Sequence, residues 1–169
     1  MDRHIFLIGM MGCGKSTLGR LLADHIGCSF ADLDEEIVRY EERSIPEIFA
    51  AEGDAGFRLC ETAALECILD EAPCVVATGG GIVTREENIR LMRRHGLVIW
   101  LNRPLEDMIA TVRQDTRPNL AGDKEERMRT LFSDREPHYK KAAHIIFDNS
   151  PPPEKSAALL HAMLKAYIR

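Results

Sequence analysis

Residues 9–16, with the sequence GMMGCGKS, combine glycines, a lysine and a serine at the spacing that binds polyphosphates. Glycines at these positions let successive backbone N–H groups turn inward, and a helix N-terminus adds positive potential. Lys15 can reach the β- and γ-phosphates, and Ser16 can ligate Mg²⁺ through its hydroxyl. The alternative is a glycine-rich turn with an exposed lysine. The motif favours a nucleotide site with these ATP-binding residues: Gly12, Cys13, Gly14, Lys15, Ser16 and Thr17.

An acidic pair follows one helix later, in the segment Phe30-Ala31-Asp32-Leu33-Asp34. If this segment is a strand, Asp32 and Asp34 point to the same side of it. Parallel sheets bind ligands beyond the carboxyl ends of their strands. We therefore predict that Asp32 holds Mg²⁺ and that Asp34 orients or deprotonates an acceptor hydroxyl. The alternative is a helix cap, because acidic residues starting at Asp34 are also typical of a helix start.

These residues must be positioned by short apolar runs that alternate with amphipathic segments. The runs are continuous, which is typical of strands covered on both faces: residues 5–8, 74–77, 97–101 and 145–147, with a weaker run at 29–31. Helical spacing of apolar residues occurs at 18–26, 105–112 and 159–168, and residues 35–70 look largely helical. Strands alternating with helices predict right-handed βαβ units and a doubly wound parallel sheet.

The bulk composition is that of one ordinary globular domain. The 169 residues carry a net charge of −5, which argues against nucleic acid as a partner. The five cysteines include no Cys-x-x-Cys pair, and we read them as free thiols in a reducing compartment. No run approaches the ~20 apolar residues of a membrane span. We expect a cytoplasmic protein without a membrane partner and, since no oligomerisation segment is visible, a monomer.

Six motifs together resemble the shikimate kinases, in the order found in that family and across roughly residues 4–148. The phosphate loop alone is common, whereas the later motifs in this order are more specific. The motifs are residues 9–16, Asp32-x-Asp34, Gly53-Asp54-Ala55-Gly56-Phe57-Arg58 with Glu61, Thr78-Gly79-Gly80-Gly81, Arg117-Pro118 and Arg135-x-x-x-Tyr139.

The resemblance implies a P-loop NTPase of the nucleoside-monophosphate-kinase-like α/β class, with a five-stranded parallel sheet flanked by helices. It implies transfer of the ATP γ-phosphate to the 3-hydroxyl of shikimate, a step towards chorismate and the aromatic amino acids. It also implies a substrate-binding subdomain at about 33–61 and a lid at about 113–124. Carried over residue by residue, the roles are Asp34, Lys15 and Arg117 in catalysis, Asp34, Arg58, Gly79, Gly80, Gly81 and Arg135 in shikimate binding, Lys15 and Arg117 at the phosphates, and Ser16 with Asp32 at Mg²⁺.

The chemistry of these side chains suits such a substrate. An arginine can grip a carboxylate with two parallel hydrogen bonds, so Arg58 and Arg135 could fix the shikimate ring. Glu61, one helical turn after Arg58, could hold its guanidinium. On its own, Arg58 reads as a solvated surface residue. Arg117 lies in an aperiodic segment that could close over the site, excluding water and bringing a cation to the transferred phosphoryl group.

Two other readings remain open on the sequence alone. Paired arginines could equally grip a phosphate, so a kinase acting on a nucleoside monophosphate, or one acting on gluconate, is a rival. A module that binds these ligands without catalysis is a second rival, although Lys15, Asp32, Asp34 and Arg117 are all present. A GTPase-type switch is disfavoured, because no Asn-Lys-x-Asp base-reading motif follows the phosphate loop.

Overall fold

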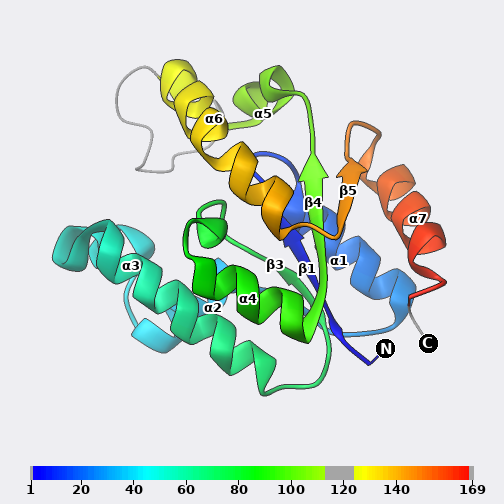
Figure 1. Ribbon diagram of the computed structural model, residues 1–169, viewed down its shortest axis with the longest axis horizontal. Coiled ribbons are helices and arrows are strands. Elements are labelled where there is room, and N and C mark those ends of the chain that lie inside the picture. The colour runs from blue at the N-terminus through cyan, green and yellow to red at the C-terminus, as the bar shows by residue number, and fades with distance from the viewer. Residues whose placement is uncertain (1, 113–123, 168–169) are drawn as a thin grey trace.

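A five-stranded parallel sheet forms the centre of the computed structural model, which describes residues 2–112 and 124–167 (Figure 1). Its strand order is β2-β3-β1-β4-β5. All five predicted strands are confirmed, including the weak candidate at 29–31. Their bounds are β1 His4–Ile8, β2 Phe30–Asp32, β3 Val75–Ala77, β4 Gly96–Asn102 and β5 Ile145–Asp148.

The central strand is β1, which pairs with β3 on one side and β4 on the other. Phe6 stands opposite Val76 and Val98 in this register, and all three side chains are fully buried. Burial on both faces explains why these strands read as continuous apolar runs in the sequence. The middle of the sheet is thus a rigid, dry base for the loops that leave it.

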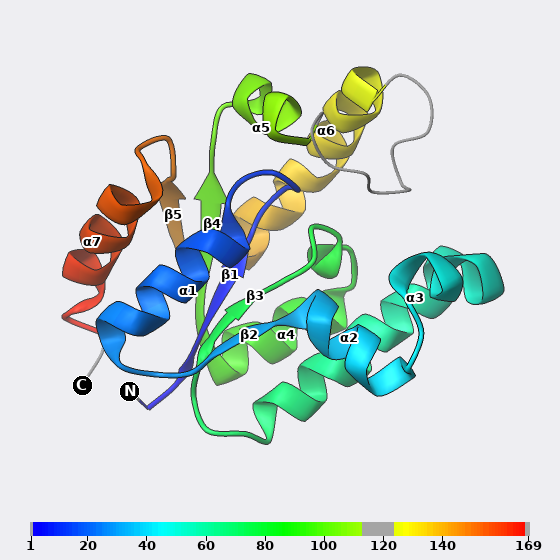
Figure 2. The ribbon, with the colours of Figure 1, turned by 180° about the vertical axis from the view of Figure 1, so that it is seen from behind.

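Helices cover both faces of the sheet. Figure 2 shows α1 in front of the sheet with α7 beside it, while α4 and α6 lie on the far face. Two further helices, α2 and α3, form a unit beyond the β2 edge, and α5 follows β4. The bounds are α1 Lys15–Ile26, α2 Leu33–Glu41, α3 Ile45–Leu69, α4 Glu86–His95, α5 Leu105–Val112, α6 Lys124–Ala142 and α7 Pro153–Leu164, with a short 3₁₀ turn, η1, at Ile82–Thr84.

The apolar face predicted for the last helix is only partly correct. Leu160 and Leu164 are buried, but Leu159, Met163 and Tyr167 are about half exposed. The helix packs on α1 along one narrow stripe, so the neighbouring apolar positions face outward. Among the described helices, none is long and apolar enough to cross a membrane.

The unit formed by α2 and α3 contains a sharp bend. Ser44 and Glu47 form a reciprocal capping box that starts α3, and Gly53 interrupts the helix with φ 68° and ψ −169°. Only glycine adopts this combination readily. The bend separates the first turns of α3 from the long segment that carries Arg58 and Glu61 towards the sheet.

The bend gives a matched pair of glycine substitutions. A Cβ at Gly53 or at Gly27 would meet no atom within 4 Å, so neither substitution causes a clash. Gly27 has φ 77° and ψ 40°, a left-handed conformation that other residues tolerate. We expect Gly53→Ala to lower the unfolding free energy by about 2–3 kcal/mol, and Gly27→Ala by about 1 kcal/mol. Urea denaturation measures both, and equal losses would contradict a strained backbone at residue 53.

Candidate active site

A cavity of about 730 Å³ opens at the carboxyl edge of the sheet. Because parallel strands all end at the same edge, the residues that follow each strand meet there. The cavity wall includes residues that follow all five strands: Met11, Gly12, Gly14, Lys15 and Ser16 after β1, Asp32 and Asp34 from β2 and α2, Thr78, Gly79 and Gly80 after β3, Arg103 after β4, and Asn149 to Pro153 after β5.

The phosphate-binding loop has the predicted form, with β1 before it and α1 after it. Gly9, Gly12 and Gly14 all have positive φ, which explains why glycine stands there. The Lys15 ammonium donates hydrogen bonds to the carbonyl oxygens of Gly9 (2.9 Å) and Met10 (2.8 Å). Lys15 therefore lies folded over its own loop, next to the place where phosphate oxygens would bind.

The acidic pair combines the two alternatives left open by the sequence. The strand ends at Asp32, so the prediction that Asp34 lies on it is wrong: Asp34 stands in the first turn of α2. Asp32 caps that helix by accepting a hydrogen bond from the Asp34 backbone N–H at 3.1 Å. Its other oxygen, Oδ2, accepts from the Ser16 hydroxyl at 2.6 Å. Asp32 is thus both a cap and a partner of Ser16, while both carboxylates line the cavity.

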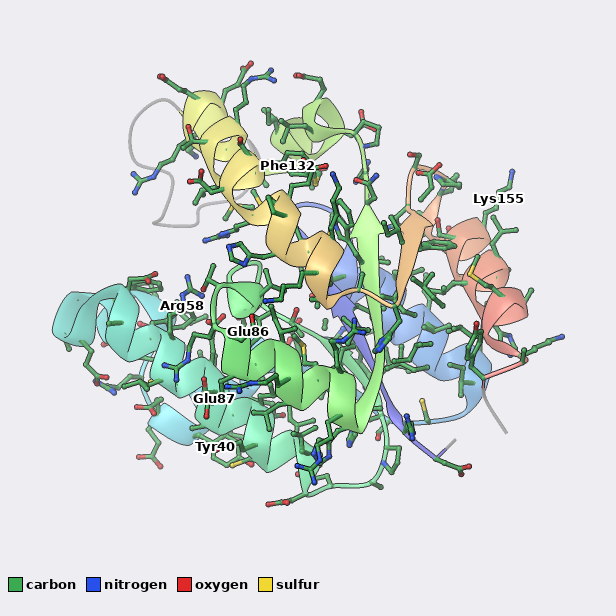
Figure 3. All side chains as sticks on the ribbon, viewed as in Figure 1. Tyr40, Arg58, Glu86, Glu87, Phe132 and Lys155 are labelled. Atoms are coloured by element: carbon green, nitrogen blue, oxygen red, sulfur yellow. The ribbon has the colours of Figure 1, made fainter. Side chains whose placement is uncertain are left out.

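Arg58 is buried, which overturns the reading of this residue alone as a solvated arginine. Its side chain is 11% exposed and that of Glu61 is 1% exposed. Nη1 donates to Glu61 Oε2 at 2.5 Å, and Nη2 donates to Asp54 Oδ1 at 3.1 Å. In Figure 3, Arg58 projects from α3 near the turn that carries η1. The predicted role of Glu61 in holding the guanidinium is confirmed by this contact.

The triple-glycine turn after β3 makes room for these side chains. A Cβ at Gly79 would lie 2.7 Å from Glu61 Oε1 and 3.1 Å from Asp34 Oδ1. A Cβ at Gly80 would lie 3.4 Å from Arg135 Nη1, and one at Gly81 would overlap the Arg58 guanidinium. None of the three has a positive φ. The absence of a side chain at each of these glycines thus lets the charged groups pack directly against the turn.

Tyr139 fixes this turn from the other side. It is fully buried, stacks on Trp100 with ring centroids 5.7 Å apart, and donates its hydroxyl to the Gly80 carbonyl oxygen at 2.5 Å. Burial raises the pKa of the Tyr139 phenol, so the hydroxyl keeps the proton that it donates. Arg135, one turn earlier on α6, is half-buried beside Gly80.

Burial also governs the charge of Glu61. Loss of hydration raises the pKa of its carboxyl group to about 7, although the neighbouring Arg58 guanidinium favours the charged form. The negative charge of Asp34 acts in the same direction as burial. Arg58 and Glu61 therefore form a charge pair whose acidic member titrates near neutral pH.

The predicted residues thus fall into three groups. The predicted loop residues other than Cys13, together with Asp32, Asp34, Gly79 and Gly80, lie on the cavity wall, whereas Cys13 is fully buried. Arg58 and Arg135 lie against the triple-glycine turn, at Gly81 and Gly80 respectively. Arg117, and all of the predicted lid at about 113–124 except Lys124, lie outside the described residues.

Sequence reasoning gave no role to Asp54, Tyr139, Arg103 or Asn149. The last two directly follow β4 and β5, and that position was the signal available for them.

Comparison with known proteins identifies one family. The model of the family described as shikimate kinase matches residues 11–165. A shikimate kinase of Nostoc punctiforme is 42% identical over 157 residues, which is 91% of this chain and 86% of that protein. A shikimate kinase of Nitrosomonas europaea is 43% identical over 148 residues, 86% of this chain and 70% of that protein.

Solved structures agree in fold. Shikimate kinase from Acinetobacter baumannii, in complex with shikimate, superposes with a TM-score of 0.91 at 34% identity, covering 99% of this chain and 96% of that one. Shikimate kinase from Aquifex aeolicus superposes with a TM-score of 0.82 at 34% identity, covering 96% and 98%. The expected P-loop, nucleoside-monophosphate-kinase-like fold with a five-stranded parallel sheet is confirmed.

The raised pKa of Glu61 predicts a pH-dependent stability that a neutral variant lacks. A group whose pKa rises from 4.5 to about 7 on folding stabilises the protein fully below pH 4.5, and that contribution is lost as the pH rises through 7. Between pH 4.5 and 8 we expect the wild type to lose about 3 kcal/mol of unfolding free energy relative to Glu61→Gln.

Urea denaturation across this pH range measures the difference. Glu87→Gln is the control, because the Glu87 side chain, in the first turn of α4 (Figure 3), is 48% exposed and pairs with Arg85 at 2.7 Å. Its curve should run parallel to that of the wild type. A Glu61→Gln curve that also runs parallel to the wild type would contradict the raised pKa.

Proposed function

The chain belongs to the shikimate kinase family, and we propose that the cavity described above is where the γ-phosphate of ATP passes to the 3-hydroxyl of shikimate. The activity is that of an ATP:shikimate phosphotransferase. One observation carries the assignment of the site. Asp34 lines the same cavity as the phosphate loop, and its carboxylate lies close to Gly79 in the triple-glycine turn, which Arg58 and Arg135 also approach. A phosphate donor and a carboxylate-bearing alcohol can therefore meet at Asp34.

The transfer is a direct displacement. The 3-hydroxyl oxygen of shikimate forms a bond to the γ-phosphorus while the bond from that phosphorus to the β–γ bridging oxygen breaks, leaving ADP. Asp34 accepts a hydrogen bond from the attacking hydroxyl and takes up its proton. Its position at the start of α2 suits this role, because the helix N-terminus favours the ionised carboxylate before transfer.

Lys15 neutralises charge on the transferred group. Its bonds to the neutral carbonyl oxygens of Gly9 and Met10 can be exchanged for bonds to anionic phosphate oxygens, which are stronger. The ammonium needs only a short movement to do so. Together with the loop N–H groups, Lys15 holds the γ-phosphate in line with the acceptor.

Ser16 and Asp32 fit a Mg²⁺ ion that accompanies ATP. Mg²⁺ prefers oxygen ligands and is commonly held by one or two protein groups together with substrate phosphates. The hydroxyl and the carboxylate are 2.6 Å apart at the base of the phosphate loop, so both can face one ion or its waters. When bound, the ion shields the phosphate charges.

Arg58 and Arg135 hold the carboxylate of shikimate. Glu61 and Asp54 keep the Arg58 guanidinium in one orientation, so little rotamer freedom is lost when the substrate binds. The unit at 33–61 would act as the substrate-binding subdomain, with Gly79, Gly80 and Gly81 shaping its contact with the sheet. We assign the lid role to 113–124, with Arg117 as the residue that contacts the phosphates.

We also propose a compartment and an oligomeric state for the protein. The five cysteines are all free, which suits a reducing cytoplasm. We also propose a monomer, as expected from the sequence. Use of ATP and of a small-molecule acceptor is a property of the family itself.

Acceptor specificity tests the proposal directly. ADP release from Mg·ATP should require shikimate and should not occur with gluconate or nucleoside monophosphates. The product should carry the phosphate on the 3-hydroxyl, as measured by phosphorus NMR. Turnover with another acceptor, or none with shikimate, would overturn the proposal.

Removing the charge of Asp34 should separate binding from turnover. Asp34→Asn keeps the shape and the backbone N–H that bonds Asp32, but the amide cannot take up a proton. We expect kcat to fall by about 10²-fold or more, with the Kd for shikimate changed less than about threefold. Glu36→Gln, in the same helical turn but paired with Arg39, should keep full activity. A normal kcat in Asp34→Asn would remove Asp34 from the mechanism.

A further inference from the structure

Two carboxyl groups face each other at the triple-glycine turn. A Cβ added at Gly79 would lie 2.7 Å from Glu61 Oε1 and 3.1 Å from Asp34 Oδ1, so a single point in space is close to both oxygens. Glu61 comes from α3 and Asp34 from α2, so the fold rather than local spacing brings them together. Two ionised acids in this position repel each other, and little water screens them, because the Glu61 side chain is 1% exposed.

Two guanidinium groups offset these negative charges. Arg58 Nη1 donates to Glu61 Oε2 at 2.5 Å, and Arg135, on α6, acts on the same carboxyl group through its positive charge. Arg58 also bonds Asp54, but the Asp54 side chain is 71% exposed and stays hydrated. The inner part of the cluster is therefore balanced, with two cations against two anions.

The other elements packed against α3 bring neutral groups to this place, as far as the chain is described. The Thr62 hydroxyl of α3 donates to Asn88 Oδ1 of α4 at 2.8 Å, and Asn88 Nδ2 donates to the Ile82 carbonyl oxygen of η1 at 3.2 Å. Tyr139, from α6, keeps its phenolic proton. The charge around Glu61 is thus set by the two acids and the two arginines.

A carboxylate substrate brings a further negative charge to this balanced cluster. When it lies on Arg58 and Arg135, it meets a guanidinium group that Glu61 already neutralises. Three carboxylates would then share two guanidinium groups, and the extra anion would be poorly compensated away from water. A proton on Glu61 removes this conflict. The neutral carboxyl group still accepts the hydrogen bond from Arg58, and the positive charge of Arg58 is left to the substrate.

We propose that Glu61 takes up a proton when the carboxylate of the substrate docks, so that the substrate anion and the proton bind together. The proton comes from the solution and forms an O–H bond on Glu61, and it is returned when the anion leaves. The inference rests on the proposed function in taking shikimate as the acid. Glu61 is then a positioning residue with two states. Ionised, it holds Arg58 before the substrate arrives, and neutral, it lets Arg58 hold the substrate.

The uptake is feasible near neutral pH. Loss of hydration raises the pKa of the Glu61 carboxyl group to about 7, so Glu61 is mostly ionised at pH 8 before the substrate binds. An additional carboxylate beside Arg58 raises this pKa further, because a like charge disfavours the ionised form. Between the two pKa values, binding of the anion therefore draws a proton from the solution.

Isothermal titration calorimetry of shikimate without nucleotide counts these protons. The binding enthalpy is measured at one pH in buffers of different ionisation enthalpy, and the slope gives the number of protons taken up. At pH 8 we expect about 0.5–0.8 proton per shikimate, and between pH 7.5 and 8.5 the Kd should rise about fivefold. Binding without proton uptake, and with the same Kd across this range, would overturn the proposal.

Glu61→Gln separates this role from a purely structural one. The amide is a neutral copy of the protonated acid, because its oxygen can accept the hydrogen bond from Arg58 but it cannot gain a proton. We expect no proton uptake at pH 8, and at pH 8.5 shikimate should bind to the variant at least as tightly as to the wild type. If Glu61 served only to hold Arg58, loss of the ion pair would weaken binding at every pH. That result, or proton uptake retained in Glu61→Gln, would overturn the proposal.

Glu87→Gln is the matched control, because it removes an exposed acid and should keep the proton uptake of the wild type. The wild-type titration decides the proposal by itself if Glu61→Gln does not fold. Turnover is measured separately, as ADP release from Mg·ATP. If shikimate binds with proton uptake but is not phosphorylated, the proposed function fails and this inference stands. If shikimate is phosphorylated but binds without proton uptake, this inference fails and the proposed function stands. If shikimate does not bind, both fail.

Discussion

The pairing of Arg58 with Glu61 is the interaction on which the substrate side of the site depends. Both side chains are almost fully buried, and a lone charge at either position would be strongly destabilising. Their contact, supported by Asp54, lets the chain keep a rigid guanidinium next to the sheet. Such a pair adds little net stability, so its main effect is to hold one orientation of Arg58 before the substrate arrives.

The pair can pack against the carboxyl edge of the sheet only because of the turn after β3. In a parallel sheet this turn lies beside the loop after β1, so any side chain on it would separate the substrate groups from the phosphate groups. Three glycines leave this space free of side chains. The hydrogen bond from the Tyr139 hydroxyl to the Gly80 carbonyl oxygen holds the turn in place. Close approach, rather than backbone flexibility, is therefore the physical reason for the triple glycine.

Sequence reasoning predicted what is encoded locally. The phosphate loop, the five strands and the Arg58–Glu61 contact each depend on residues within one or two turns of each other, and all were found. The burial of Arg58 was missed, because it depends on a turn more than 20 residues away. The predicted place of Asp34 on the strand was also wrong, because the alternation of a strand and the acidic start of a helix predict different elements for the same residues. Arg103 and Asn149 form their contacts only through tertiary packing, so the one signal for them in the sequence was their position directly after β4 and β5.

The two ends of the nucleotide site differ in how they are satisfied without ligand. At the phosphate end, Lys15 bonds to carbonyl oxygens of its own loop, and Ser16 bonds to Asp32, so every key group has a partner to exchange. Exchange of this kind gives a modest net free energy, because bonds are broken as others form. At the ends of β4 and β5, Arg103 Nε and Asn149 Oδ1 are buried and have no hydrogen-bond partner among the described residues. The groups of the phosphate loop are thus suited to accepting and releasing a charged group in each cycle.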